Sequence, residues 1–277
     1  MAWSVVGSAG EGLAEALEGV EAVVHSAGAT PANAGRGDSA AEAYRSSVVF
    51  SRRLAETVSV AGVRAVVHLS SVAVLGRPEA LGGAILDDSR KPDPGTDYGR
   101  SKRDCEQALD AAAAPDRPVV HLRPPLIFGP GAKGAWGSLV SLARSPLPLP
   151  FGSVANRRSF LGIGNLASLV EAVLAKAGQG GLSGAYLAAD RETVSLREVC
   201  TALRGALGRG AGLLPFPPAL LAAALRAAGR AETAAGLLGD LVVDASPARE
   251  AFAWDPDEPT LAAMARSVSV PTPSRCA

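Results

Sequence analysis

Three short apolar runs end in the same way, and this repetition constrains the fold more than any other feature of the sequence. Residues 22–25, 65–68 and 118–121 read Ala-Val-Val-His, Ala-Val-Val-His and Pro-Val-Val-His. Consecutive apolar residues in runs of this length are typical of parallel strands that are buried on both faces. The carboxyl ends of such strands share one edge, where open α/β sheets bind ligands. We therefore expect a ligand site where these runs end.

Helical patterns separate the apolar runs. Strands are expected at residues 3–6, 21–25, 63–69, 119–122, 184–188 and 241–243, and helices at 11–17, 39–61, 98–114, 133–144, 165–177, 195–207 and 218–228. This alternation predicts right-handed βαβ units and an α/β fold with a Rossmann-like, doubly wound parallel sheet. We expect residues 1–127 plus 160–190 to form the dinucleotide-binding domain, 128–159 plus 191–270 a smaller C-terminal substrate-binding lobe, and 271–277 a tail.

Composition excludes several functions. The 277 residues carry a formal net charge of zero, so nothing favours binding to nucleic acid or to an anionic membrane surface. Cys105, Cys200 and Cys276 show no paired spacing, which argues against a disulfide framework or a zinc site. Residues 213–228 are interrupted by three prolines and an arginine, so we expect no membrane span. Without a secretion signal at the start, the expected location is cytoplasmic.

Tyr98 and Lys102 form the strongest candidate for chemistry. Four residues apart on a helix, they lie about one turn from each other. An ammonium near a phenol favours the phenolate and lowers a pKa that starts near 10, which suits proton exchange with an alcohol. Ser71 follows the strand that ends near His68 and can orient the same substrate oxygen. A Tyr-x-x-x-Lys pair also arises by chance, so the prediction depends on these neighbouring strand ends.

The histidines at the ends of the three apolar runs are the chain's only ones: His25, His68 and His121. Their regularity suggests a metal site. However, each lies in a different buried strand and not on one helical face, so we interpret them as core or strand-end histidines and expect no metal.

Several segments together resemble a known family. Residues 25–28, 70–71, 98–102 and 123–131 are similar to the extended short-chain dehydrogenase/reductase family, specifically the UDP-glucose 4-epimerase group of NAD-dependent epimerase/dehydratases. The resemblance covers nearly the whole chain. Its most specific part, residues 146–160, resembles a branch that acts on UDP-N-acetylhexosamines in surface-polysaccharide synthesis.

The resemblance implies a role for each site residue. Tyr98 would be the general acid/base, Lys102 would bind the nicotinamide ribose, and Ser71 would hydrogen-bond the reacting sugar oxygen. The remaining residues divide between NAD or NADP and the substrate: the cofactor set adds Ala27, Gly28, Ser70, Pro124 and Pro125, and the substrate set adds Lys133 and Arg158. A guanidinium suits a pyrophosphate; the alternative for Arg158 is a solvated surface arginine.

The chain departs from the family at its start. The family opens with a strand, a Gly-rich turn that holds the pyrophosphate, and a second strand whose end selects NAD or NADP. We find neither this opening nor this second strand here, because the glycines of residues 7–12 have the wrong spacing. We therefore expect an N-terminally incomplete sheet and a shortened form of a longer enzyme. A protein that starts at Met1 should bind NAD(P) poorly. Four further positions differ from the usual residue: Ser47, Leu75, Ala135 and Asn165.

Two functions remain at this point. The first is a nucleotide-sugar 4-epimerase or 4-keto-sugar reductase, acting on a UDP-hexose or UDP-N-acetylhexosamine by NAD(P) hydride transfer. The alternative is a non-catalytic nucleotide-sugar-binding or truncated, inactive relative. The resemblance also makes a homodimer possible. The sequence leaves open the sugar, the direction of the chemistry and the choice between NAD and NADP.

Overall fold

A computed structural model describes residues 12–76, 83, 85–176 and 182–269. Its main sheet has the strand order β1-β2-β4-β7, and all neighbouring strands are parallel. The strands are β1 (Ala22–His25), β2 (Ala65–Leu69), β4 (Val119–Arg123) and β7 (Gly184–Leu187). This confirms the predicted parallel α/β sheet. The expected strand at residues 3–6, Cys276 and the tail lie outside the described residues.

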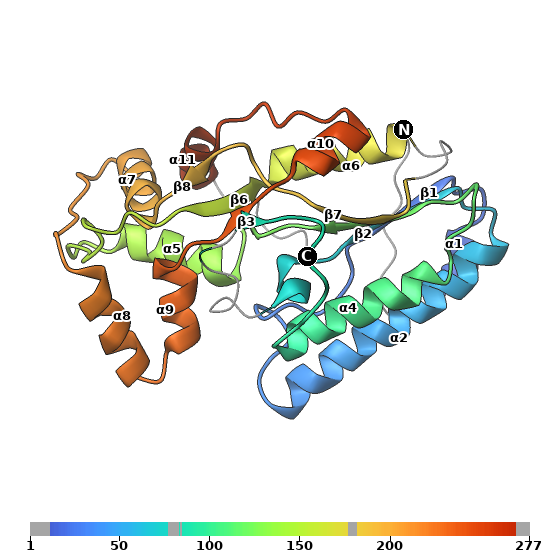
Figure 1. Cartoon of the computed structure of the whole chain (residues 1–277), viewed down its shortest axis with the longest axis horizontal. Helices are drawn as coiled ribbons and strands as arrows, with labels where there is room; N and C mark the ends of the chain where they lie inside the picture. The colour runs from blue at the N-terminus through green and yellow to red at the C-terminus, as the bar shows by residue number, and fades with distance from the viewer. Residues whose placement is uncertain (1–11, 77–82, 84, 177–181, 270–277) are drawn as a thin grey trace.

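Helices cover both faces of the main sheet (Figure 1). The pair α2 (Asp38–Val60) and α4 (Asp97–Asp110) lies side by side on one face, and α6 (Ile163–Ala175) and α10 (Ser246–Phe252) lie on the other. Helix α2 ends just before Gly62, whose positive φ of 73° is the expected glycine stop. The doubly wound arrangement predicted from the sequence is therefore present.

The remaining elements build a second region at the other end of the molecule (Figure 1). Here β6 (Arg158–Gly162) pairs with β5 (Leu126–Phe128) and β8 (Thr193–Val194), while β3 (Ile85–Leu86) pairs with β9 (Val242–Val243). The helices are α5 (Gly134–Arg144), α7 (Leu196–Ala206), α8 (Pro218–Ala227), α9 (Ala231–Leu238) and α11 (Thr260–Ser269).

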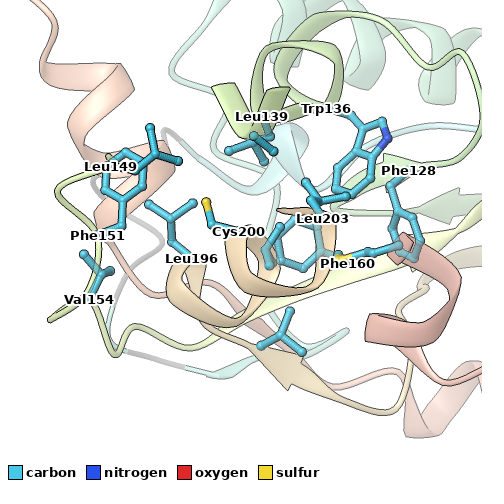
Figure 2. Close-up of a cluster of buried hydrophobic side chains, with 14 of the residues drawn as sticks. Phe128, Trp136, Leu139, Leu149, Phe151, Val154, Phe160, Leu196, Cys200 and Leu203 are labelled. Carbon is cyan, nitrogen blue, oxygen red and sulfur yellow. The ribbon is translucent and has the colours of Figure 1, made fainter. Parts of the chain in front are cut away.

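An apolar core fills this second region. Figure 2 shows Phe128, Trp136 and Phe160 meeting Cys200 and Leu203 of α7. Helix α7 begins where the sequence predicts, because Ser195 and Glu198 form a reciprocal capping box. No helix in the described part of the chain combines the length and apolarity needed to cross a membrane.

Several elements differ from the sequence-based prediction. The strands β3, β5, β6 and β8 and the helices α9, α10 and α11 were not predicted, because most are short and lack a clear hydrophobic period. Arg158 begins β6. The strand pairs with β5 and β8, the Ser159 hydroxyl accepts a hydrogen bond from the Val243 backbone (3.0 Å), and Phe160 enters the apolar core. The predicted helix at 11–17 is reduced to α1 (Leu13–Ala16).

Candidate functional site

The candidate site lies where β2 and β4 end. The Val72 backbone donates to the Pro124 carbonyl (3.0 Å), and the Ser70 backbone donates to the Leu122 carbonyl (2.8 Å). These bonds hold the segment after β2 against the segment after β4. They bring Ser70 and Ser71 beside Pro124 and Pro125, as expected for two parallel strands that end at one edge.

Gly99 sets the position of Tyr98. Thr96 is the N-cap of helix α4, and its hydroxyl accepts a hydrogen bond from the Gly99 backbone (3.0 Å). A Cβ at Gly99 would collide with the Ala73 carbonyl in the short helix η1 (Val72–Leu75). The missing side chain therefore lets α4 approach η1 closely. The Ser71 hydroxyl, at the start of η1, reaches the Tyr98 phenol and hydrogen-bonds to it.

The pKa of Tyr98 differs from the expectation. Burial raises the pKa of its phenol above the usual value, and the hydrogen bond from Ser71 opposes this shift. Tyr44 on α2, with its ring centroid 6.2 Å from that of Tyr98, raises the pKa further. The prediction that Lys102 lowers this pKa is therefore wrong for the structure, because desolvation of the phenol has the larger effect.

Lys102 is buried one helical turn after Tyr98. Its side chain is 7% exposed, and Nζ donates to the Leu69 carbonyl at 2.8 Å. Burial lowers the pKa of Lys102, whereas Cys105 and Glu106 raise it. Lys102 is thus fixed between α4 and the end of β2, next to the Ser71–Tyr98 pair.

The loop after β1 reaches the same place. Gly28 has a φ of 148°, and a Cβ built there would lie 3.8 Å from Lys102 Nζ and 3.6 Å from Ser47 Oγ. The Ser47 hydroxyl also accepts from the Ala29 backbone (2.8 Å) and so fixes this loop to α2. The predicted residues Ala27 and Gly28 therefore lie at the same sheet edge as Lys102.

The two predicted substrate residues lie apart from this group. Lys133 is exposed at the start of α5. Arg158 is partly buried, and its guanidinium donates to the carbonyls of Gly239 (2.7 Å) and Ala235 (3.3 Å) at the end of α9. The surface-arginine interpretation is therefore wrong for Arg158. No hydrogen bond or ion pair between described residues joins Lys133 or Arg158 to Tyr98 or Lys102.

The sequence analysis did not identify the residues that hold the site in place. Arg123 at the end of β4 and Glu106 on α4 form a buried bidentate ion pair, with N–O distances of 2.9 and 2.6 Å. Ser47 was noted only as a departure from the family, although it anchors the loop that contains Gly28. The signal that could have found Glu106 is its spacing, since it lies one turn after Lys102 on the same helix.

The three histidines form one row across the sheet. His25, His68 and His121 occupy the same register on β1, β2 and β4, with neighbouring ring centroids 5.1 and 5.4 Å apart. His25 Nε2 bonds Ser51 Oγ (2.9 Å), and His121 Nε2 bonds Asp110 Oδ1 (3.0 Å). Within the described ranges, no cluster of three or more His, Cys, Asp or Glu side chains is arranged to hold a metal ion.

Comparison with known proteins finds a matching family and a related enzyme. Residues 9–189 match the model of the NAD dependent epimerase/dehydratase family. A UDP-glucose 4-epimerase of Vibrio cholerae is 32% identical over 210 residues, which cover 74% of this chain and 62% of that protein. The match thus spans less than two thirds of the relative's length.

Solved structures share the fold at lower identity. The UDP-N-acetylglucosamine 4-epimerase from Bacillus cereus superposes with a TM-score of 0.73 at 18% identity, covering 96% of this chain and 84% of that one. The UDP-glucuronic acid 4-epimerase from Bacillus cereus in complex with NAD gives 0.69 at 19% identity, with coverages of 92% and 76%. At these identities the likeness concerns the fold alone.

Proposed function

The chain belongs to the NAD-dependent epimerase/dehydratase family, and on that premise we propose that it interconverts a hydroxyl and a carbonyl at C4 of a nucleotide-linked sugar. The observation that supports this most is the arrangement of three side chains. Ser71 hydrogen-bonds to the Tyr98 phenol, and Lys102 is buried one turn further along α4. A hydroxyl, a phenol and an ammonium at one sheet edge can bind a sugar oxygen and move its proton.

The residues at this edge fit a nicotinamide cofactor. Gly28 has a φ of 148°, which favours glycine, and its backbone lies close to Ser47 and Lys102 at this edge. Ser70 has a buried hydroxyl without a hydrogen-bond partner among the described residues. Bound NAD or NADP would accept or supply the hydride. Lys102 would bind its ribose, and Ala27, Gly28, Ser70, Pro124 and Pro125 would line its site.

In this proposal the protein's own groups perform the proton transfer. Ser71 orients the C4 oxygen of the sugar towards Tyr98. Tyr98 as phenolate accepts the hydroxyl proton during oxidation and, as phenol, returns it during reduction.

The substrate would be a UDP-hexose or a UDP-N-acetylhexosamine, since the relatives found by comparison are named for UDP-sugars. Arg158 would bind the pyrophosphate. To do so its guanidinium must exchange the α9 carbonyls for phosphate oxygens, which form stronger, charge-assisted bonds. The division into a dinucleotide-binding domain and a substrate-binding lobe belongs to this proposal, as does the homodimer.

Replacing Tyr98 by Phe tests the proposal. Turnover of UDP-sugars with NAD or NADP should fall by a factor on the order of 10² to 10⁴, because only the proton carrier is removed. Tyr44→Phe is the matched control, since this neighbouring phenol should be dispensable. Near wild-type turnover in Tyr98→Phe would contradict the proposal. UDP binding by a wild-type protein that turns over no UDP-sugar would instead favour the non-catalytic alternative.

The same assay separates the two reactions. A 4-keto-sugar reductase oxidises one NAD(P)H for each sugar it reduces, whereas a 4-epimerase leaves the total cofactor pool unchanged. Product analysis with and without added NAD(P)H, over a panel of UDP-sugars and 4-keto sugars, should therefore identify one of them.

A further inference from the structure

Large apolar side chains gather at one end of the second region. Of the eight that are exposed among the described residues, four lie here: Leu147, Leu214, Phe216 and Leu220. We refer to these four as the apolar tip. They come from the loop after α5, the segment 211–217 and the start of α8, where Figure 1 shows α8 and α9 projecting from the molecule. Single exposed apolar residues are ordinary, but a group of them marks an interaction surface.

Hydrogen bonds hold the segments of the apolar tip side by side. The Leu214 backbone donates to the Leu149 carbonyl at 2.8 Å. The guanidinium of Arg204 on α7 donates to the carbonyls of Leu147 and Gly210, each at 3.2 Å. The loop that carries Leu147 therefore lies against the segment that carries Leu214, and the side chains of the tip share one surface.

The fold leaves the apolar tip uncovered. Helix α8 has no buried residue. Leu213 and Leu221 are partly buried against the apolar core of the second region. Their neighbours Leu214 and Leu220 are 54% and 58% exposed, because adjacent residues of a strand or a helix point in different directions. Burying these leucines in a partner would therefore stabilise a complex.

This end of the molecule is also basic. Residues 199–231 contain four arginines and no aspartate, glutamate or lysine. Of these arginines, Arg209, Arg226 and Arg230 are exposed, and so is Arg144 at the end of α5. The whole chain has a formal net charge of zero, but the exposed charges that flank the apolar tip are positive.

Shape and charge together favour a lipid surface as the occupant. The headgroup layer of a bilayer is fluid, so it accepts a projecting apolar group without a matching pocket. Arginine stems lie along apolar surface while their guanidinium groups reach lipid phosphates. A second copy of the chain fits less well, because a two-fold interface brings each patch against itself and would place these arginines against one another.

We propose that the apolar tip docks onto an anionic lipid surface. The tip enters the headgroup region, and the arginines around it bind the lipid phosphates. The protein lies on the surface and does not span it. This proposal does not depend on the proposed function, since it concerns a surface that contributes no residue to the candidate site.

Co-sedimentation with lipid vesicles tests the proposal. The wild-type chain should bind vesicles of mixed phosphatidylglycerol and phosphatidylcholine on the order of tenfold more tightly than vesicles of phosphatidylcholine alone, because only the mixed vesicles are anionic. Added salt should reduce this difference, since it screens charges at the surface. Equal binding to the two kinds of vesicle, or binding to neither, would overturn the proposal.

Two double variants separate the apolar from the ionic contribution. Phe216→Ser with Leu220→Ser should weaken binding to the mixed vesicles at least on the order of tenfold, because less apolar area leaves water. Arg209→Glu with Arg226→Glu should abolish the preference for the anionic vesicles. Thermal unfolding checks that each variant is folded.

The matched controls lie far from the apolar tip in the sequence. Val60 at the end of α2 is 86% exposed, and Arg64 in the following loop is exposed as well. Val60→Ser and Arg64→Glu should leave vesicle binding unchanged. Losses in the tip variants no larger than in these controls would overturn the proposal.

Light scattering of the lipid-free protein tests the other occupant. The wild type and the variant Phe216→Ser with Leu220→Ser should have the same mass in solution. A smaller mass for the variant would show that the apolar tip joins two copies of the chain, and would overturn the lipid proposal. None of these measurements needs turnover, so a wild-type protein without activity on UDP-sugars would contradict only the proposed function.

Discussion

The two faces of the main sheet have opposite characters, although the same strands form both. On one face Val67, Val120 and Leu122 pack against α6 and α10, whose buried side chains include Leu169 and Phe252. The other face, towards α2 and α4, has an apolar end around Val66 and Val119 and a polar end near the proposed site. Consecutive residues of a strand point to opposite faces, so one sequence builds both environments.

The polar end of the second face is buried as well. It contains the three histidines, Lys102 and the ion pair of Arg123 with Glu106. Burying such groups costs free energy unless each finds a partner, whereas burying apolar side chains stabilises the fold. The comparison indicates that the apolar face supplies stability, and that the polar face holds charges beside the site at a cost in stability.

Breaking the ion pair should have the largest effect on stability. Glu106→Gln keeps the shape of the side chain but leaves the Arg123 guanidinium buried without its counter-charge. The free energy of unfolding should fall by about 3–5 kcal/mol. Urea denaturation measures this loss. Asp97→Asn, which breaks an exposed pair with Arg100 on the same helix, is the control and should change little. A loss no larger than in that control would contradict the view that the polar face holds buried charges which depend on their partners.

Acid should destabilise the polar face. Burial, then the charges of Lys102 and His121, lower the pKa of His25 to about 4. The unfolded chain binds this proton below about pH 6.5 and the folded chain only below about 4, so stability falls as the pH falls between these values. The loss from His25 alone should reach up to about 3 kcal/mol. Urea denaturation across this pH range measures it.

The matched variants compare the two faces directly. His25→Gln should weaken the acid dependence, because one of the titrating groups is gone, while His68, whose pKa burial also lowers, still contributes. Leu169→Ala, on the apolar face, should lower the free energy of unfolding by about 2–5 kcal/mol at every pH. If Leu169→Ala altered the acid dependence as much as His25→Gln, the two faces would not differ in the way described.

The smallest effect should come from a polar contact on the apolar face. Trp254, buried against α6, donates from Nε1 to Ser168 Oγ at 2.9 Å. Ser168→Ala leaves that donor unpaired and should cost about 1–3 kcal/mol, with no dependence on pH between 4 and 6.5. Thermal unfolding at several pH values measures this. Ser138→Ala, at an exposed position on α5, is the control. A pH-dependent loss in Ser168→Ala would count against the difference between the apolar and the polar face.

Local patterns in the sequence determined the strands of the main sheet, most of the longer helices and several residues of the candidate site. The apolar runs before His25, His68 and His121 predicted three of the four main strands. The spacing of Tyr98 and Lys102 placed both on one helix, and Ser195 marked the start of α7. These features depend on residues within a few positions of one another, so hydrophobic period, helical spacing and capping suffice to recognise them.

Only the tertiary structure decided how these elements meet. Strand register aligned the three histidines, the absence of a side chain at Gly99 let α4 approach η1, and the end of α9 supplied the partners of Arg158. The direction of the Tyr98 pKa shift likewise depended on burial. Such properties arise from contacts between segments far apart in the chain, and burial and distance between those segments are set by packing and not by local sequence.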